Sequence, residues 1–292
     1  MADPRKERFR AHLAGSSCLT AAGIFDPISA RLADHLGFPI GMLAGSVASA
    51  YVLAAPDVAV MTSHELAQQA RRITQVAELS LMVDADHGFG NALNVMRTVT
   101  ELEAAGVCAM TLEDSVLPAR HGAPRGQEIV TTEEMVGKLE AALAARRDAA
   151  TAIIGRTEAL KLDLPEDQRI AVAIERATAY AATGIDAFFV TGVGTLQQAA
   201  AISDAVDLPI VASGVPRDVT DEQLSIHGFR IALRGHAPFR AMVQGIYRAL
   251  EHQAAGRPAD ELQPYLADDE LQALATNAAD HTAQADWYLG TD

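Results

Sequence analysis

Short apolar runs alternate along the chain with longer segments in which apolar residues recur every three or four positions. In the segment 94–106, "NVMRTVTELEAAG", this spacing places Val95, Val99 and Leu102 on one face and a glycine at the end, which predicts an amphipathic helix. The short apolar runs are typical of strands. Eight strands are predicted, at 18–23, 39–45, 79–85, 107–113, 151–157, 186–192, 209–214 and 230–235.

Eight strands that alternate with helices predict a parallel (β/α)8 TIM barrel. Several of the strands are apolar without alternation, as expected when both faces are buried. An open, doubly wound sheet is the alternative, but no GxGxxG motif follows the first strand. We expect residues 1–252 to form the barrel. The acidic residues 253–292, in which "DDELQALA" predicts a short helix, either pack on a neighbouring subunit or are partly disordered.

Composition narrows the class of protein. The 292 residues carry a formal net charge of −15, which argues against a nucleic-acid partner and against binding to anionic membranes. No apolar run approaches the ~20 residues needed to cross a bilayer, and the charged first residues lack the apolar segment of a secretion signal. We therefore expect a cytoplasmic protein in which Cys18 and Cys108 are reduced, buried thiols.

Polar or charged residues finish nearly every predicted strand. In a TIM barrel the active site lies at this end of the strands, in the loops that lead to the helices. The residues at these ends are Asp26, Ser46, Asp84, Asp86, Glu113, Asp114, Arg156, Thr191, Ser213, Arg234 and His236.

Three of these carboxylates suit a divalent metal ion. Asp84, Asp86 and Glu113 end neighbouring strands, and oxygen ligands without nitrogen or sulfur favour Mg²⁺ or Mn²⁺. Magnesium keeps several waters, so one direct carboxylate with water-mediated contacts to the others fits this set. The alternative is that Asp86 or Asn91 caps the next helix and Glu113 pairs with an arginine. A lone DxD motif favours that alternative, whereas Glu113 on the adjacent strand favours the metal.

Other strand-end residues suit an anionic substrate. Arg156 ends an apolar strand, so it either clamps a substrate carboxylate or forms a salt bridge with Glu113 or Glu158. The Gly-Ser turn at Ser46 exposes backbone N–H groups that suit a carboxylate or enolate oxygen, although a plain turn is the common explanation. His236 follows the last strand and would face the barrel mouth.

Two further histidines lie near the predicted site. His87 follows Asp86 and is a candidate partner of the metal ligands. His121 lies in the Pro- and Gly-bearing segment 117–130, which is long enough to form a lid. The sequence shows no Ser-His-Asp order, G-x-S-x-G elbow, phosphate loop or zinc-ligand spacing.

Four segments together resemble one known superfamily. Over residues 15 to 250, "AGSVAS", "APDVAVMT", "DADHGFGNALNVMRTVTELEAAGVCAMTLED" and "IIGRTEA" are similar to the isocitrate lyase/phosphoenolpyruvate mutase superfamily. The pairing of "GSVAS" with the late "RGHA" most resembles its bacterial oxaloacetate decarboxylase branch. The resemblance implies a barrel whose eighth helix is swapped with a neighbour, and a homotetramer built as a dimer of such dimers.

The resemblance also implies roles for particular residues. It places Mg²⁺ directly on Asp84, with Asp86 and Glu113 reached through water. It implies that 2-oxo dicarboxylates are the substrates. It assigns catalysis to Ser46, Arg156 and His236, and substrate binding to these three together with Val47 and, with a less certain role, Asp57.

The segment after strand four distinguishes branches of the superfamily. The carbon–carbon lyases carry a K-K-C-G-H loop there, whereas this chain reads "LPARHGAPRG", and Cys108 lies inside the strand. The lysine and asparagine of the phosphonopyruvate enzymes are absent from this loop too. The resemblance therefore implies Mg²⁺-dependent decarboxylation of oxaloacetate to pyruvate and CO2. The alternatives are a lyase or hydrolase acting on another 2-oxo or malate-like acid, and a non-catalytic barrel that binds dicarboxylates.

Overall fold

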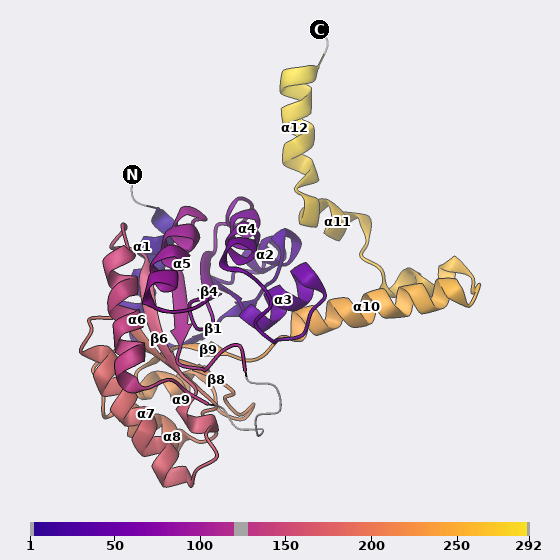
Figure 1. Ribbon diagram of the computed structural model, residues 1–292. Helices are drawn as coiled ribbons and strands as arrows, with labels where there is room; N and C mark the ends of the chain where they lie inside the picture. Colours follow the sequence, from indigo (N-terminus) through magenta and orange to yellow (C-terminus); the bar gives the residue numbers. More distant parts are fainter. Residues whose placement is uncertain (1–2, 120–127, 291–292) are drawn as a thin grey trace.

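The computed structural model describes residues 3–119 and 128–290, which form a parallel barrel surrounded by helices (Figure 1). Every strand pair is parallel, and the strand order is β1-β9-β8-β7-β6-β5-β4-β3-β2. The strands are β1 (Leu19–Thr20), β2 (Ala22–Gly23), β3 (Ile40–Leu43), β4 (Ser80–Asp84), β5 (Ala109–Glu113), β6 (Ala152–Thr157), β7 (Ala187–Thr191), β8 (Ile210–Ser213) and β9 (Phe229–Leu233).

The barrel closes through the split first strand. Only Ala21 separates β1 from β2, and β1 pairs with β9 while β2 pairs with β3. Ala21 N–H donates to the carbonyl of Ala232 (3.1 Å), and Ile24 N–H donates to that of Met42 (3.0 Å). The predicted strand 18–23 is therefore present in two short pieces. The predicted barrel is confirmed, and the open doubly wound sheet is wrong.

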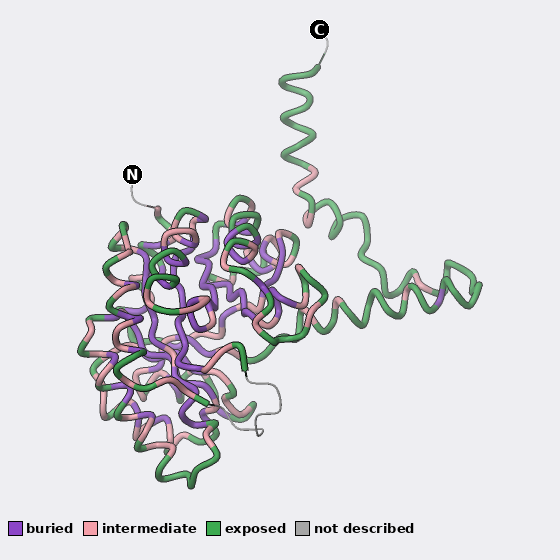
Figure 2. The backbone as a smooth tube through the Cα atoms, in the orientation of Figure 1, coloured by how far each residue is buried: buried purple, intermediate pink, exposed green. Residues whose placement is uncertain are grey.

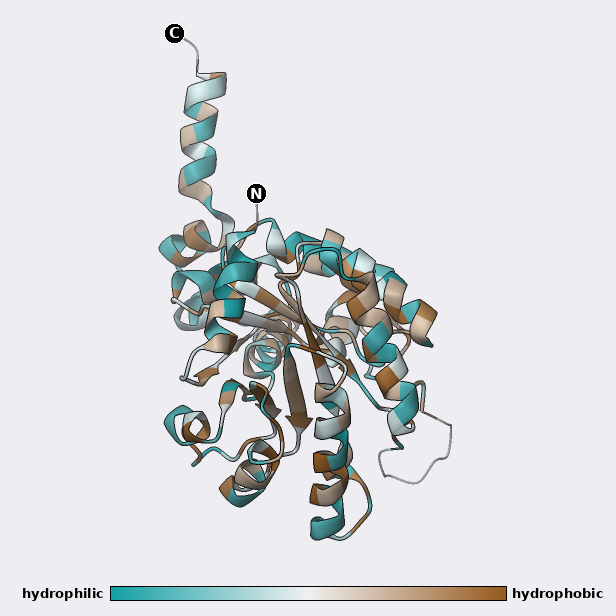
Figure 3. Ribbon diagram, turned by 90° about the vertical axis from the view of Figure 1, so that its left-hand side faces the viewer, coloured by the Kyte–Doolittle hydropathy of each residue, from teal (hydrophilic) through white to brown (hydrophobic). Residues whose placement is uncertain are grey.

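The strands β3 to β8 are mostly apolar because both of their faces are buried. One set of side chains, which includes Met82, Ile154 and Phe189, fills the barrel interior, and a second set packs between the strands and the helices. Figure 3 shows hydrophobic strand segments at the centre and hydrophilic surface on the surrounding helices.

The helices that follow the strands begin at side-chain caps in most cases. Asp26, Thr62, Asn91, Thr131, Thr195 and Thr220 each accept a hydrogen bond from the first turn of their helix. The helices around the barrel are α2 (Pro27–His35), α3 (Gly45–Leu53), α4 (Ser63–Thr74), α5 (Ala92–Ala104), α6 (Thr132–Ala145), α7 (Glu166–Ala181), α8 (Leu196–Ser203) and α9 (Asp221–Ile226), with the short 3-10 turn η1 (Ala159–Lys161) before α7.

An N-terminal helix, α1 (Pro4–Ala14), closes the barrel at the end opposite the strand-to-helix loops. Phe9 and Leu13 are buried and pack into the interior layer. Charged residues on the same helix reach the barrel rim, where Lys6 pairs with Asp148 (2.8 Å) and Arg10 with Asp186 (2.5 Å). The hydrophobic pattern did not predict this helix because charged residues outnumber the apolar ones in it.

Asp186 anchors this closed end. It precedes β7, pairs with Arg10 and Arg146 (2.5 and 2.6 Å), and accepts a hydrogen bond from Ile153 N–H (2.8 Å). One largely buried carboxylate therefore joins α1, the end of α6 and the start of β6.

After β9 the chain extends away from the barrel as α10 (Ala237–Ala254) and comes back to contact α2 through α11 (Asp269–Thr276; Figures 1 and 2). His252 is the one buried residue of α10. Beyond it lie η2 (Ala259–Tyr265), α11 and α12 (Ala278–Leu289), none of which has a buried residue. The short helix predicted from "DDELQALA" is confirmed as α11. Within residues 3–119 and 128–290, no helix is long and apolar enough to cross a membrane.

We predict that Phe9→Ala destabilises the barrel. Phe9 is 0% exposed, and removing its ring leaves a cavity that costs about 3–5 kcal/mol of the free energy of unfolding. Urea unfolding followed by circular dichroism measures this loss. Leu36→Ala is the control, because Leu36 is 73% exposed, and its change should stay within about 0.5 kcal/mol. Equal effects of the two variants would contradict the packing of α1 into the barrel.

Candidate active site

The ends of three neighbouring strands bring Asp84, Glu113 and Arg156 together. Arg156 Nη1 lies 2.6 Å from Asp84 Oδ2, and Arg156 Nη2 lies 2.8 Å from Glu113 Oε2. Glu113 and Arg156 are register partners across β5 and β6. All three side chains are largely buried, with 9%, 7% and 15% of their surface exposed in the order named. The predicted cluster of strand-end residues therefore includes a closely ion-paired centre.

Arg156 is also held from its other side. Its Nε donates to Glu158 Oε1 (2.9 Å) and to Thr191 Oγ1 (3.2 Å), and its guanidinium lies 5.2 Å from the centre of the Phe189 ring. Lys161 Nζ lies 2.6 Å from Glu158 Oε2. Both salt bridges considered from the sequence, to Glu113 and to Glu158, are present. A substrate role for Arg156 must therefore act alongside these ion pairs.

Acidic groups outnumber cations in this cluster. Burial raises the pKa of Glu113 to about 7; Arg156 opposes this shift, and Asp84 and Glu158 add to it. Burial also raises the pKa of Asp86 well above its usual range, with Asp84 and Glu113 as the next causes. The centre therefore has more acidic groups than Arg156 can neutralise, and an added cation would reduce the repulsion between their carboxylates.

Asp86 lies in the turn after β4 and faces the start of α3. Its φ is +46°, its N–H donates to Asp84 Oδ1 (3.3 Å), and its carbonyl accepts from Glu113 N–H (2.8 Å). A Cβ on Gly45 would lie 2.1 Å from Asp86 Oδ1, so only glycine leaves room for this side chain. Asn91, not Asp86, caps α5.

The first turn of α3 contains Ser46 and Val47. Ala44 precedes it without a side-chain cap, so the N–H groups of this turn keep their capacity to bind an anion. Ser46 is half-buried and Val47 is buried. Val47 lines a small cavity together with Met42, Phe239 and His236.

His236 and Asp57 complete the predicted set. His236 directly precedes α10 and is exposed, yet the protein around its ring lowers its pKa, against the opposing effects of Asp84 and Asp57. Asp57, between α3 and α4, is exposed too, and its pKa is raised by burial of its carboxylate and by Asp84. Each of the two residues affects the pKa of the other, and Asp84 raises the pKa of both, so all three lie within electrostatic range of one another.

The structure describes one of the two additional histidines. His87 is buried, Lys138 Nζ donates to its carbonyl (3.3 Å), and burial followed by Lys138 lowers its pKa to about 4. His121 lies outside the described residues, as does most of the segment 117–130. The lid therefore stays a prediction.

The donor set at the mouth fits a hydrated magnesium ion. In the described part of the chain, no three His, Cys, Asp or Glu side chains converge closely enough to hold a metal by themselves. The oxygens of Asp84, Asp86 and Glu113 are hard ligands in a region of excess negative charge, as Mg²⁺ prefers. A metal ion here would therefore need water to complete its coordination shell.

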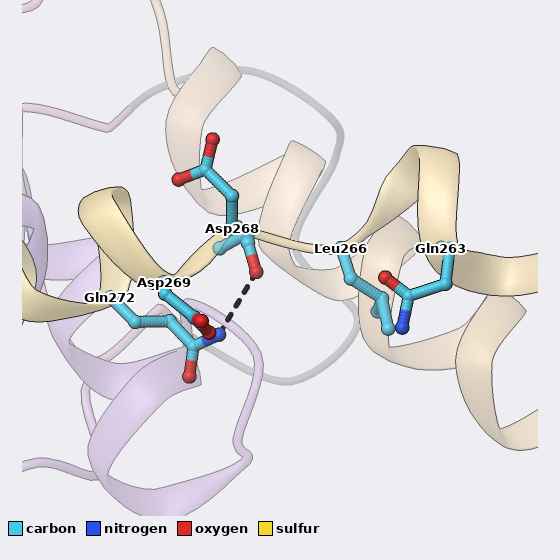
Figure 4. A pocket seen from close by; sticks show the side chains of 6 residues that line it. Gln263, Leu266, Asp268, Asp269 and Gln272 are labelled. Carbon is cyan, nitrogen blue, oxygen red and sulfur yellow. Dashed lines mark hydrogen bonds between the residues drawn. The ribbon is translucent and has the colours of Figure 1, made fainter.

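A hollow on the surface lies elsewhere, between η2 and α11 (Figure 4). It measures about 550 Å³ and is lined by Gln263, Leu266, Ala267, Asp268, Asp269 and Gln272. Gln272 Nε2 donates to the carbonyl of Ala267 across it (2.9 Å). Its lining residues are exposed and it is far from the strand ends, so we assign it no chemistry.

Several residues that shape the site were assigned no role from the sequence. Thr111 Oγ1 donates to Asp84 Oδ1 (3.0 Å), and Asp114 is buried beside Glu113. The one signal for Asp114 is its place at a strand end. Asp26, another strand-end residue, caps α2, and Arg234 pairs with Asp221 (2.6 Å).

Comparisons with known proteins agree with this geometry. A sequence model described as phosphoenolpyruvate phosphomutase matches residues 9–254. A protein named oxaloacetate decarboxylase, from Rhodopseudomonas palustris strain BisB18, is 48% identical over 94% of this chain and 93% of its own length. Two solved structures are each 27% identical. One is a phosphoenolpyruvate phosphomutase from Streptomyces platensis subsp. rosaceus, with a TM-score of 0.87 over 97% of this chain and 99% of that one.

The second structure is a phosphonopyruvate hydrolase in complex with oxalate and Mg²⁺, with a TM-score of 0.85 over 98% of this chain and 99% of the other. Family match, identity and fold extend over nearly the same residues. The chain therefore belongs to the phosphoenolpyruvate phosphomutase family.

Proposed function

We propose that this protein decarboxylates oxaloacetate to pyruvate and CO2 with the help of a divalent metal ion. The observation that carries the proposal is the buried cluster of Asp84, Glu113 and Arg156 at the barrel mouth. It occurs in a chain that is 48% identical to a protein named oxaloacetate decarboxylase. The loop after β5 has no cysteine, which disfavours the general acid–base chemistry of the carbon–carbon lyases.

Asp84, Asp86 and Glu113 would hold Mg²⁺ or Mn²⁺, Asp84 directly and the other two through water. The related phosphonopyruvate hydrolase, in complex with oxalate and Mg²⁺, supports this part of the proposal. When bound, the metal ion supplies a Lewis acid for the negative charge that develops on the substrate.

Arg156 and the first turn of α3 would orient the substrate. The Arg156 guanidinium binds a substrate carboxylate, and the N–H groups at Ser46 and Val47 hold a developing oxyanion. As the C3–C4 bond breaks, C4 leaves as CO2 and the bond's electron pair passes into the enolate of pyruvate. A proton added at C3 then completes the product.

His236 would act late in the reaction. It either binds the departing carboxylate or helps to protonate the enolate at C3. Asp57 lies within electrostatic range of His236 and would contribute to substrate binding through its charge.

We also propose that four copies assemble through α10, with each α10 packing on a neighbour's barrel. The support is the exposed apolar surface of this helix, which includes Val243, Ile246, Tyr247 and Leu250.

The division into a barrel of residues 1–252 and a tail of residues 253–292 is also part of the proposal, as is a cytoplasmic location. The described thiols, Cys18 and Cys108, are both buried and free, which suits a reducing compartment.

We predict that the wild-type protein releases CO2 from oxaloacetate in the presence of Mg²⁺ and that Asp84→Ala abolishes this activity, because the direct metal ligand is lost. The assay follows pyruvate and CO2 after subtraction of the metal-catalysed background. Glu140→Gln, on the exposed surface of α6, serves as control. A substrate panel monitored for glyoxylate and phosphate as well distinguishes other reactions. Near-normal turnover by Asp84→Ala would exclude the metal assignment, and a silent wild type would exclude decarboxylation.

We expect His236→Ala to lower kcat/KM by roughly 100-fold, the usual scale for losing a group that acts on a proton or a charge. A rise in KM with kcat retained indicates that His236 binds the leaving carboxylate, whereas a fall in kcat indicates proton transfer. Steady-state kinetics on oxaloacetate separates the two. Unchanged kinetics would remove His236 from the site.

We expect light scattering to give about four times the chain mass of 30.9 kDa, and Ile246→Asp to reduce that mass, because a carboxylate would be buried in the contact. Ile246 is 53% exposed in the isolated chain. Glu140→Ala provides the control for a surface change on the barrel. A wild-type monomer, or an unaltered tetramer in Ile246→Asp, would refute assembly through this face of α10.

A further inference from the structure

Asp114 follows Glu113 at the end of β5, and it is completely buried. Its carboxylate joins the ends of β5 and β6 to α7, because its donors come from the last two of these elements. They are Thr157 Oγ1 (2.6 Å), Glu158 N–H (3.0 Å), Arg176 Nη1 (2.9 Å) and Tyr180 OH (2.9 Å).

Two of these donors follow Arg156 directly in the chain. The bond from Glu158 N–H to Asp114 Oδ1 fixes the backbone of Glu158. The Glu158 carboxylate in turn accepts from Arg156 Nε and Nη2 (2.9 and 2.5 Å). The orientation of the Arg156 guanidinium therefore depends on where Asp114 holds the start of the β6–α7 connection.

The far side of the cluster is braced by α7. Arg176 Nη1 also contacts Tyr180 OH (3.0 Å), and Arg176 Nη2 donates to the carbonyl of Val130 (2.6 Å). Val130 N–H donates to the Asp114 carbonyl (2.7 Å). Burial and the adjacent Asp114 carboxylate raise the pKa of Tyr180, so its hydroxyl stays protonated and donates.

We propose that Asp114, with Arg176 and Tyr180, is a positioning cluster that fixes Glu113 and Arg156 relative to each other. These residues act through Glu113 and Arg156 and do not touch the substrate. The inference rests on the proposed function for its kinetic readout. The competing explanation is that Asp114 only stabilises the fold, as buried, ion-paired carboxylates commonly do.

Asp186 provides a matched control at the opposite end of the barrel. Like Asp114, it is a largely buried aspartate that accepts from arginine and from a backbone N–H, here that of Ile153 (2.8 Å). It precedes β7, whereas the active-site residue Thr191 ends that strand. The two aspartates thus share their chemistry and differ in distance from the site.

The test compares Asp114→Asn with Asp186→Asn. Asparagine keeps the shape of aspartate but replaces one carboxylate oxygen with an NH2 group. That group cannot accept the hydrogen bonds that the replaced oxygen accepted. We expect both variants to lower Tm by similar amounts. Asp114→Asn should lower kcat/KM for oxaloacetate by about 100-fold, whereas kcat/KM of Asp186→Asn should stay within about twofold of the wild-type value. A loss of less than about threefold in Asp114→Asn, or equal losses in both variants, would overturn the proposal.

Tyr180→Phe keeps the test informative if Asp114→Asn does not fold, since it removes a single buried hydroxyl. We expect kcat/KM to fall by about 5- to 10-fold, on the lower side of the effect of an orienting group; wild-type kinetics in this variant would count against the cluster.

A binding readout separates this inference from the proposed function. Calorimetry measures oxalate binding in the presence of Mg²⁺, and we expect about 10-fold or greater weakening in Asp114→Asn and none in Asp186→Asn. A wild type that binds oxalate without decarboxylating oxaloacetate overturns the proposed function, while the difference in oxalate affinity still decides the positioning role. Equal affinities in the two variants would overturn the positioning role.

Discussion

The guanidinium of Arg156 is the interaction on which the barrel mouth depends. Asp84, Glu113 and Glu158 end or follow three neighbouring parallel strands, and carboxylates buried so close together repel one another. A planar, permanently charged group with five N–H donors can contact all three at once, which a lysine could not do. Burial raises the pKa of Asp86 well above its usual range, and the charges of Asp84 and Glu113 raise it further, so Arg156 does not compensate all of the acidic groups. A site that retains negative charge after its own arginine is paired is suited to attract a cation.

This charged layer rests directly on an apolar one. The Phe189 ring lies under Arg156, and below it Ile154, Met82 and Cys108 belong to the interior packing that Phe9 closes from the other end. The five consecutive strands from β4 to β8 therefore carry mostly apolar residues along their length and a polar residue at their last position. Folding depends mainly on the first set and chemistry on the second, so the strand ends can vary in charge while the barrel is retained.

The sequence predicted what depends on local pattern. Runs such as 79–85 and 107–113 are mostly apolar, as strands buried on both faces are. Eight of them alternate with helices, which favours a barrel over an open sheet and places the polar residues that follow the strands at its mouth. The sequence did not predict α1, whose fold-stabilising contacts come from two apolar residues among many charges. Asp114 received no role because its function depends on donors up to 66 positions away along the chain, at Tyr180, and no local pattern records such a contact.

The start of α10 links the site to association between copies. His236 lines the mouth cavity together with Val47, and the next residue begins the helix that carries Ile246 and Leu250 into solvent. In the proposed assembly these apolar residues are buried on a neighbour, which fixes the direction of the helix and with it the position of His236. The part of the barrel mouth formed by His236 then depends on subunit contacts, whereas the cluster of Asp84, Glu113 and Arg156 is complete within one chain. Dissociation would therefore impair the late role of His236 before it affected the acidic centre.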